Sequence, residues 1–301
     1  GSEDKTVRLW DVAGIEAGEA RGCMRIFGRE SQNHTNWVMS VAYAAEDSLI
    51  VSGSMDGTIR FWDATTGECT KTLVDQQNPG RVWATALSPD SRFLASSSKD
   101  DSLIRLWNLE DEELTILGRE DGHGAWITSL AFNPVDANIL ASSSIDCTIR
   151  LWNSETGKCI KTLQGHRGWV AAIAFSKDGS TLVSSSEDYD IKVWDVQNNS
   201  VNPCLKTLRG HSSRIWSVAI SPDGRTVASG SNDREVKLWD KDTGRCLRTL
   251  QGHPNWITSI AFSSDGKMLF SGNEDKTVKQ WNIGTCSDGL SLPMQESREF
   301  C

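Results

Sequence analysis

Short runs in which apolar and polar residues alternate recur along the chain and predict β-strands. In the phrase "TIRLW", Ile149 and Leu151 alternate with Thr148 and Arg150, the period of a strand with one buried face. A second run, such as "TLVSSS", lies upstream, after a turn such as "SKDG" or "SPDG" in which glycine supplies a positive φ. A more apolar run such as "WVAAIAFS" precedes that turn, and "CIKTLQGH" follows the alternating run. The pattern predicts four short antiparallel strands in each repeat.

Seven tryptophans end the alternating runs and show how long the repeat is. They lie 42 to 52 residues apart, at Trp10, Trp62, Trp107, Trp152, Trp194, Trp239 and Trp281. An aspartate stands six positions before each of them, at Asp4, Asp56, Asp101, Asp146, Asp188, Asp233 and Asp275. Repeats of about 40–45 residues that contain four strands are typical of β-propeller blades. We therefore predict an all-β propeller.

All five histidines occupy one position of the repeat, and Asn78 takes that position in a sixth repeat. They are His34, His123, His166, His211 and His253, and 28 or 29 residues separate this position from the next repeat-ending tryptophan. The variable lengths therefore fall between a tryptophan and the following histidine. The longest insertion, 11–33, is either a docking element or an idle connection, and we favour the second.

These residues carry a family resemblance. Gly-His dipeptides at 122–123, 165–166, 210–211 and 252–253, paired with Trp-Asp or Trp-Asn endings, make residues 1–282 similar to Trp-Asp (WD) repeat β-propellers. The resemblance implies seven repeats of four-stranded antiparallel blades, over a propeller domain at 1–283 with a C-terminal tail at 284–301. The near-identical later repeats also resemble those of large bacterial, cyanobacterial-type multidomain regulatory proteins.

The resemblance also implies a hydrogen-bonded network of His, Ser, Asp and Trp inside each blade. Such a network is chemically reasonable because an imidazole can link a carboxylate to a hydroxyl, and the indole N–H adds a donor. Carried over position by position, the three sets are His166, Ser184, Asp188, Trp194; His211, Ser229, Asp233, Trp239; and His253, Ser271, Asp275, Trp281. The third repeat departs from the pattern, since Asn78 replaces the histidine and either Ser96 or Ser97 is the hydroxyl partner. We expect the weakest network there.

The two ends of the chain hold incomplete repeats. The first repeat shows only two strands, at 5–10 and 23–28, and the last shows three. In the tail, Leu290–Met294 would make a poor fourth strand, with Pro293 suited to an edge. We expect the first blade to be incomplete at the N-terminus and the parent protein to continue before Gly1. The resulting open seam exposes strand edges and can promote self-association, while the oligomeric state is left open.

Composition narrows the class of protein. The chain has 301 residues, a formal net charge of −9 and 38% hydrophobic residues, which suits a soluble globular protein. The acidic balance argues against nucleic-acid binding, because phosphates would meet net repulsion. No apolar run is long enough to span a membrane. Five of the eight cysteines share one strand position of the repeat, so neighbouring copies lie too far apart for disulfides, and we expect a reducing, cytoplasmic setting.

No arrangement of residues points to catalysis. The histidines and aspartates hold repeat positions, the acidic cluster 110–113 reads as a solvated turn, and phosphate-binding and hydrolase motifs are missing from the sequence. We predict a protein that is not an enzyme and has no cofactor and no metal site.

A second set of six tryptophans begins the innermost strands. Trp37, Trp126, Trp169 and Trp256 follow the histidine position by three residues, where the other two repeats carry Arg81 and Arg214. Trp83 and Trp216 lie two residues further on, level with Met39. The odd spacing of Val170 and Ile173 predicts a β-bulge near residues 171–172, and bulges re-aim side chains at rims.

Innermost strands of a propeller surround a channel, so these side chains are expected to ring one mouth of it. Tryptophan and arginine are enriched at interaction hot spots, and we therefore predict a scaffold or sensor domain that binds a protein or peptide there. It would be part of a larger regulatory protein. The alternatives are that the tryptophans only pack between blades, or that a small ligand binds and controls an attached NTPase or effector module.

Overall fold

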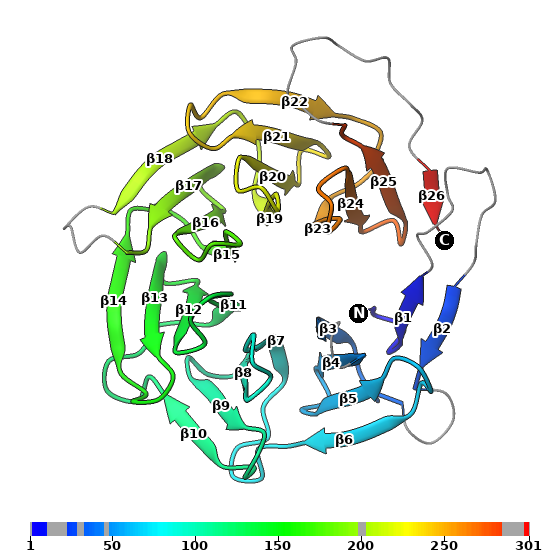
Figure 1. Ribbon diagram of the computed structural model, residues 1–301, viewed down its shortest axis with the longest axis vertical. Coiled ribbons are helices and arrows are strands. Elements are labelled where there is room, and N and C mark those ends of the chain that lie inside the picture. Colours follow the sequence, from blue (N-terminus) through cyan, green and yellow to red (C-terminus); the bar gives the residue numbers. More distant parts are fainter. Residues whose placement is uncertain are drawn as a thin grey trace. The chain divides into compact units, whose positions relative to one another are not determined.

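The fold is built entirely from strands in the residues that the structure describes. The computed structural model describes residues 2–10, 23–28, 33–44, 48–197, 203–284 and 298–300. Within these ranges there are 26 strands, β1 to β26, and no helix (Figure 1). The chain divides into two compact units, one made of residues 1–130 and 154–158 and the other of residues 131–153 and 159–301.

The first unit contains one two-stranded sheet and two four-stranded sheets. The two-stranded sheet pairs β1 (Val7–Trp10) with β2 (Cys23–Phe27). The next sheet has the order β3 (Val38–Ala44), β4 (Leu49–Ser54), β5 (Ile59–Asp63), β6 (Cys69–Leu73). The third contains β7 (Val82–Leu87), β8 (Phe93–Ser98), β9 (Ile104–Asn108) and β10 (Leu114–Leu117).

Four more four-stranded sheets follow along the chain. The first has the order β11 (Ile127–Phe132), β12 (Ile139–Ser144), β13 (Thr148–Asn153), β14 (Cys159–Gln164). The next two are β15 (Val170–Phe175), β16 (Thr181–Ser186), β17 (Asp190–Asp195), β18 (Cys204–Arg209), and β19 (Ile215–Ile220), β20 (Thr226–Ser231), β21 (Val236–Asp240), β22 (Cys246–Leu250). The last is β23 (Ile257–Phe262), β24 (Met268–Asn273), β25 (Val278–Asn282), β26 (Arg298–Phe300).

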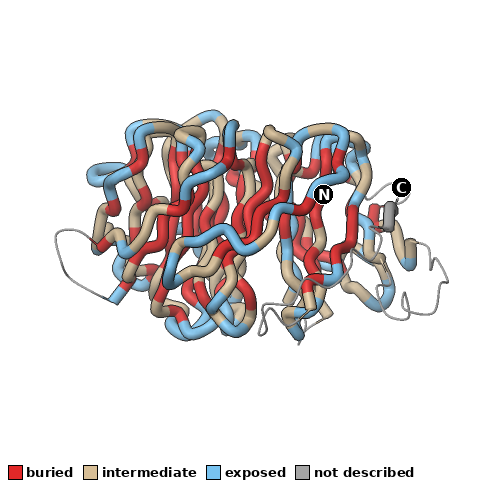
Figure 2. The backbone as a smooth tube through the Cα atoms, turned by 90° about the horizontal axis from the view of Figure 1, so that it is seen from above, coloured by how far each residue is buried: buried red, intermediate tan, exposed pale blue. Residues whose placement is uncertain are grey.

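The position of a strand within its sheet determines how it is buried. In β16 every residue is buried, because the strand has a neighbour on each side and both of its faces are covered. The serines Ser184, Ser185 and Ser186 make this close packing sterically easy. The outer strands β14 and β18 are less buried than β16: each has one buried residue, and the others are exposed or partly exposed, since only one face packs. Figure 2 shows the same contrast, with buried residues along the strands and exposed residues at the turns.

Apolar side chains of neighbouring sheets interdigitate to form the core. In the second unit, Val183, Ile191 and Val193 of one sheet pack with Ile215 and Val218 of the next. The tryptophans that end the third strands are the largest side chains of this core, and Trp62, Trp152, Trp194 and Trp239 are at most 1% exposed. Each removes on the order of 200 Å² from water, so the repeat-ending indole contributes strongly to sheet-to-sheet packing.

The β-bulge predicted near residues 171–172 is present. The register between β15 and β16 shifts between Val170 and Ala172. The innermost strands β3, β7, β19 and β23 show the same shift at their second residue. Because the bulge recurs, it re-aims the start of the innermost strand in the same way in these sheets.

Two predictions can be compared with the observed sheets: the number of blades and the number of strands in the last blade. Antiparallel four-stranded blades of an all-β propeller are confirmed. The described residues form six of them and one two-stranded sheet, so a count of seven blades is not confirmed. The last sheet has a fourth strand, β26, which pairs Val278 with Phe300, whereas no convincing one was expected from the tail. A three-residue strand has no periodicity to detect, and the open edge of β25 accepts backbone hydrogen bonds from any extended segment. The segment Leu290–Met294 lies outside the described residues.

Candidate functional site

The repeat histidine follows the outer strand of one sheet and connects three side chains of the next repeat. His166 Nδ1 lies 2.9 Å from Asp188 Oδ2, and its Nε2 lies 2.8 Å from Ser184 Oγ. Trp194 Nε1 donates a hydrogen bond of 2.8 Å to the same hydroxyl. Because the hydroxyl accepts from the indole, its own proton is available for Nε2, which leaves the imidazole proton on Nδ1 for the carboxylate. This assignment satisfies all four buried groups.

The structure brings together the whole His211 set and, of the last set, His253, Ser271 and Trp281. His211 contacts Asp233 and Ser229 at 2.7 Å each, and Trp239 donates to Ser229 at 2.8 Å. In the last sheet, His253 Nε2 lies 2.6 Å from Ser271 Oγ, and Trp281 Nε1 donates to that hydroxyl at 2.7 Å. Asp275 accepts from the backbone N–H and the hydroxyl of Thr277. A fourth network joins His34 to Asp56 and Ser52 at 2.9 and 2.8 Å, with Trp62 donating to Ser52.

The pKa values of Asp56, Asp188 and Asp233 lie below the ordinary value, which favours the ionised carboxylate. Burial opposes the charge of Asp188, but the hydrogen bond from His166 and two backbone N–H donors bring its pKa to about 2. Asp233 has the same balance, with burial opposed by His211, and its pKa is also about 2. The pKa of Asp56 lies still further below its ordinary value, again against burial and because of His34.

We expect acidification to remove the stability that these carboxylates provide. A lowered pKa in the folded state stabilises the fold above the ordinary value of 3.8, and this contribution is lost as the pH falls toward about 2. Each of Asp188 and Asp233 should account for about 2 kcal/mol of the free energy of unfolding. Urea titrations at a series of pH values between about 5 and 2 measure the loss.

Asp188→Asn should flatten this pH dependence, because the variant has no carboxylate to protonate at that position. Asp242→Asn is the matched control, since the Asp242 side chain is 76% exposed. Equal slopes of unfolding free energy against pH in the two variants would contradict the assignment.

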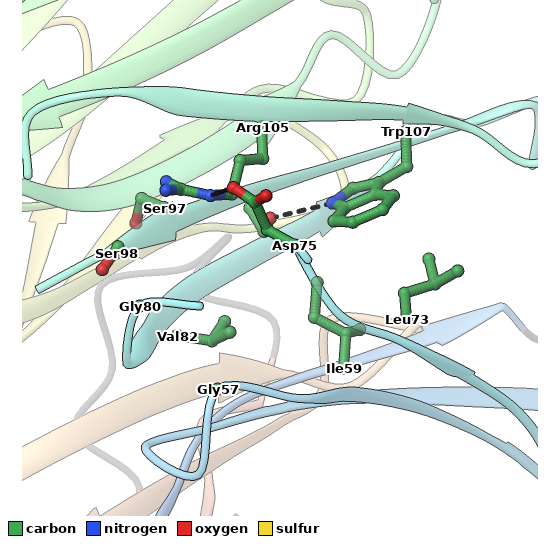
Figure 3. A pocket seen from close by; sticks show the side chains of 11 residues that line it. Gly57, Ile59, Leu73, Asp75, Gly80, Val82, Ser97, Ser98, Arg105 and Trp107 are labelled. Carbon is green, nitrogen blue, oxygen red and sulfur yellow. Dashed lines mark hydrogen bonds and ion pairs between the residues drawn. The ribbon is translucent and has the colours of Figure 1, made fainter. Parts of the chain in front are cut away.

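The third repeat replaces the histidine network by ion pairs (Figure 3). Arg105 Nε donates to Asp75 Oδ2 at 2.8 Å, and Nη2 donates to Asp101 Oδ2 at 2.8 Å. Asn78, at the histidine position, donates to Asp101 Oδ2 at 3.2 Å. The side chains of Arg105 and Asp75 are 5% and 7% exposed. This repeat therefore has a buried, charged network where the sequence led us to expect the weakest one.

The same repeat settles which serine is the partner of the tryptophan. Trp107 Nε1 donates to Ser96 Oγ at 3.1 Å, whereas Ser97 Oγ donates to the backbone carbonyl of Ile127. Asp75 is the sequence signal that could have indicated the ion pairs. Arginine or lysine stands two residues before the tryptophan in every repeat, so Arg105 alone was uninformative.

A small cavity adjoins this ion-paired network. Arg105, Asp75 and Trp107 line it together with Leu73 and Val82, as Figure 3 shows. Its volume is about 10 Å³, about the least that holds one water molecule. The cavity is therefore too small for a metabolite.

In the first unit, the second set of tryptophans is partly exposed at the start of innermost strands. Trp37 directly precedes β3 and is 43% exposed, and Trp126 directly precedes β11 and is 42% exposed. Trp83 on β7 is half-buried, as is Met39 on β3. The Lys99 ammonium lies 5.0 Å from the ring centroid of Trp83 and 5.2 Å from that of Trp126, within the range of a cation–π contact.

Arg81 takes the tryptophan position in the third repeat and is held by Asp100. The Arg81 backbone N–H donates to Asp100 Oδ2 at 2.8 Å, and Nε donates to Oδ1 at 3.0 Å. The hydrogen bonds from Arg81 lower the pKa of Asp100 to about 2. Both side chains remain exposed, at 50% and 39%.

In the second unit, Trp169 and Trp256 directly precede β15 and β23 and are 40% and 43% exposed. The Arg214 guanidinium lies 5.6 Å from the ring centroid of Trp169 and forms an ion pair with Glu187. Trp216 is half-buried and its Nε1 donates to Asn232 Oδ1. We call the six residues that directly precede the innermost strands the rim row: Trp37, Arg81, Trp126, Trp169, Arg214 and Trp256.

Sequence reasoning missed the residues that hold the rim row. They directly follow the second strand of each four-stranded sheet. The backbone N–H groups of Met55, Lys99, Glu187, Asn232 and Glu274 donate to the carbonyls of Trp37, Arg81, Trp169, Arg214 and Trp256, respectively. This support column is chemically varied: Met55, Lys99, Ile145, Glu187, Asn232 and Glu274. The sequence offered one clue to these residues: each lies between the second strand and the aspartate that stands six positions before the repeat-ending tryptophan. Because only glutamate occurs there more than once, the position did not stand out.

Comparison with known proteins identifies the repeats. The pattern described as "WD domain, G-beta repeat" matches six segments of the chain, at residues 23–63, 67–108, 114–153, 157–195, 202–240 and 244–282. These segments cover more than half of the sequence. The chain belongs to this WD-repeat family. The sheet β1–β2 contributes only its second strand to the first matched segment.

Several WD-repeat relatives are similar over part of their length. The chain is 31% identical over 167 residues to WD repeat-containing protein SL1-17 of Schistosoma mansoni, covering 56% of this chain and 53% of that protein. It is 29% identical over 164 residues to Target of rapamycin complex subunit wat1 of Schizosaccharomyces pombe, covering 54% and 37%. It is 31% identical over 250 residues to Nuclear distribution protein nudF of Emericella nidulans, covering 65% and 56%. The chain thus spans about half the length of these relatives or less.

These relatives are eukaryotic, so they do not support the predicted likeness to bacterial, cyanobacterial-type multidomain proteins. They also give no support to the alternative of a small-ligand sensor that controls an NTPase or effector module.

Three other features concern the part of the WD-repeat chain that the structure describes: metal binding, membrane spans and thiols. Within it, no cluster of three or more His, Cys, Asp or Glu side chains could bind a metal. Nor does it contain a helix with the length and apolar character needed to cross a bilayer. The six cysteines of the described part form no disulfide: Cys23, Cys69, Cys147, Cys159, Cys204 and Cys246.

Proposed function

We propose that this WD-repeat protein is a non-catalytic scaffold that binds a protein or peptide partner through the rim row. The observation that carries the proposal is the exposure of its four tryptophans, which lies between 40% and 43%. The repeat-ending tryptophans of the six four-stranded sheets are at most 9% exposed. The rim tryptophans and the repeat-ending tryptophans thus lie in different environments. Of these two groups, the rim tryptophans have ring surface left for a partner.

The physical properties of the rim row suit partner binding. A tryptophan offers a large, rigid contact area at low entropic cost, and it is enriched among residues that dominate binding energy. Asp100 and Glu187 orient Arg81 and Arg214 by ion pairs while the guanidinium groups remain exposed. A partner carboxylate can therefore meet a pre-oriented bidentate donor.

We infer that the support column contributes specificity. Its side chains differ from sheet to sheet, and two of them contact rim residues: Lys99 contacts Trp126 and Glu187 contacts Arg214. Trp126 thus lies beside a positive charge and Arg214 beside a negative one. Complementary charges around apolar anchors favour one partner over others.

The proposed scaffold role also has support from a relative. The name of wat1 describes that relative as a subunit of a complex, which is the kind of role that we propose here. We further propose that the sheet β1–β2 is the outer half of a seventh blade and that the chain is part of a larger regulatory protein. The six described thiols agree with a reducing, cytoplasmic location.

Affinity capture from the source lysate tests the proposal. A bait in which Trp37, Trp126, Trp169 and Trp256 are changed to alanine should lose partners that the unchanged chain retains. Removing one true anchor costs about 2 kcal/mol of binding, which is about a 30-fold loss of affinity.

The matched control changes four exposed apolar residues outside the rim row. Val135→Ala, Ile160→Ala, Leu205→Ala and Leu247→Ala affect side chains that are 43% to 68% exposed, and this bait should retain the partners. Circular dichroism melting of both baits checks that they are folded. Equal capture by the two baits would refute the rim row as the binding surface.

A further inference from the structure

Lys99 of the support column contacts two tryptophan rings in the first unit. Its ammonium lies 5.0 Å from the ring centroid of Trp83 and 5.2 Å from that of Trp126, so both indoles stabilise the same charge. The backbone fixes the lysine beside the rim row, because its N–H donates to the Arg81 carbonyl at 2.9 Å. Lys99 is half-buried, and Trp126 is 42% exposed. The two rings therefore shield the ammonium in part while one of them still faces solvent.

The Lys99 ammonium has no counter-ion within the residues that the structure describes. The neighbouring carboxylate, Asp100, accepts from the backbone N–H and the Nε of Arg81 and is used by that ion pair. In another sheet the support residue is paired, since Glu187 forms an ion pair with Arg214. Arg81 and Asp100 neutralise each other, so Lys99 is the charge left without a partner at its part of the rim row. Its three N–H donors can reach a ligand.

This arrangement of charge selects the chemistry of the ligand. The rings of Trp83 and Trp126 already stabilise a cation, so a partner lysine or arginine would meet a like charge. A phosphate group carries nearly two negative charges and is typically bound by a cluster of cations, whereas Lys99 offers one. The formal net charge of −9 repels a strongly acidic segment at long range. A single carboxylate among uncharged residues fits best.

We propose that Lys99, Trp83 and Trp126 form a subsite for one aspartate or glutamate side chain of a partner peptide. The subsite rests on the proposed binding of a partner at the rim row. The Lys99 ammonium donates to the carboxylate, and an apolar residue next to the acidic one covers the exposed ring of Trp126. Because the indoles exclude water from part of the ammonium, this ion pair is stronger than one between fully exposed groups. Lys99 thus determines the charge of the ligand.

Selection from a peptide library tests the subsite on the full chain. The probe is a library of random short peptides displayed on phage and fused through their C-termini, so a selected carboxylate comes from a side chain. Rim-dependent peptides are those that the variant with Trp37, Trp126, Trp169 and Trp256 changed to alanine does not bind. Those selected by the unchanged chain should share an acidic residue next to an apolar one. Selection by Lys99→Glu should give a basic residue in its place.

Variants of Lys99 locate the contact with a selected acidic peptide. Lys99→Met has similar length but no charge, and should weaken binding by at least about tenfold in fluorescence anisotropy. Lys99→Arg keeps the charge and should keep most of the affinity. A carbodiimide, which takes up the water released, should couple the peptide carboxyl to the Lys99 amine as an amide, and Lys99→Arg should abolish this coupling.

Lys177→Met is the matched control. Lys177 is exposed and follows β15 at the opposite end from Trp169, so this variant should bind the peptide as the unchanged chain does. Circular dichroism melting checks that all variants are folded.

The possible outcomes separate the subsite from the proposed function. Rim-dependent peptides without an acidic residue, or with binding that Lys99→Met leaves unaltered, overturn the subsite while the proposed function stands. Tighter binding of a peptide that carries phosphoserine in place of the acidic residue overturns the assignment to a carboxylate. A selection that yields no rim-dependent peptide contradicts the proposed function and the subsite together.

Discussion

Replacing Trp194 by alanine should lower the free energy of unfolding by about 3–5 kcal/mol. Trp194 is fully buried and packs with Leu151, Val170 and Ile173. Its indole N–H also donates to Ser184, and its ring lies edge-on to His166 with 6.1 Å between centroids. The change therefore removes core volume and leaves the hydroxyl without its donor. Chemical denaturation monitored by circular dichroism measures the loss.

Trp169→Ala is the matched control for this prediction. The same residue type is removed from the same repeat, but Trp169 is 40% exposed and its ring contact is with the exposed Arg214. Its loss should cost about 1 kcal/mol or less. If the proposed function is correct, Trp169→Ala lowers partner affinity instead. Equal destabilisation by the two variants would show that the rim tryptophan is a packing residue.

Replacing Arg105 by methionine should destabilise the protein by about 3–5 kcal/mol. The guanidinium is the cation between two carboxylates, and the side chains of Arg105, Asp75 and Asp101 are 5%, 7% and 18% exposed. Methionine has similar length but no charge, so the variant leaves two poorly solvated carboxylates facing each other. Urea denaturation at neutral pH measures the effect.

Arg81→Met is the control for the ion pair. Arg81 also forms a bidentate contact with an aspartate, but both partners are exposed to solvent. Exposed pairs contribute little to stability, so we expect a small change. A similar loss in the two variants would contradict the conclusion that burial, and not the mere presence of an Arg–Asp pair, gives the third repeat its network.

Much of the fold could be predicted from local sequence. Alternation around Trp194, the turn at Gly179 and the aspartate at 188 all lie within one repeat, and each acts through contacts with residues close in the chain. The grouping of His166, Ser184, Asp188 and Trp194 could be inferred because the family resemblance supplies it. The bulge at Val170 and Ala172 followed from an odd spacing of two core residues. Local periodicity carries these features because strand pairing within a blade is sequential.

Other features depend on which surfaces meet after folding. Trp169 and Trp194 both border apolar strands, yet one is 40% exposed and the other fully buried, because only the second faces a neighbouring sheet. The ion pair of Arg105 with Asp75 joins residues 30 positions apart, and β26 pairs through backbone groups that any extended segment can offer. Residue pattern thus specifies each blade, whereas burial, charge pairing and open edges are decided by the contacts between blades, which no single repeat encodes.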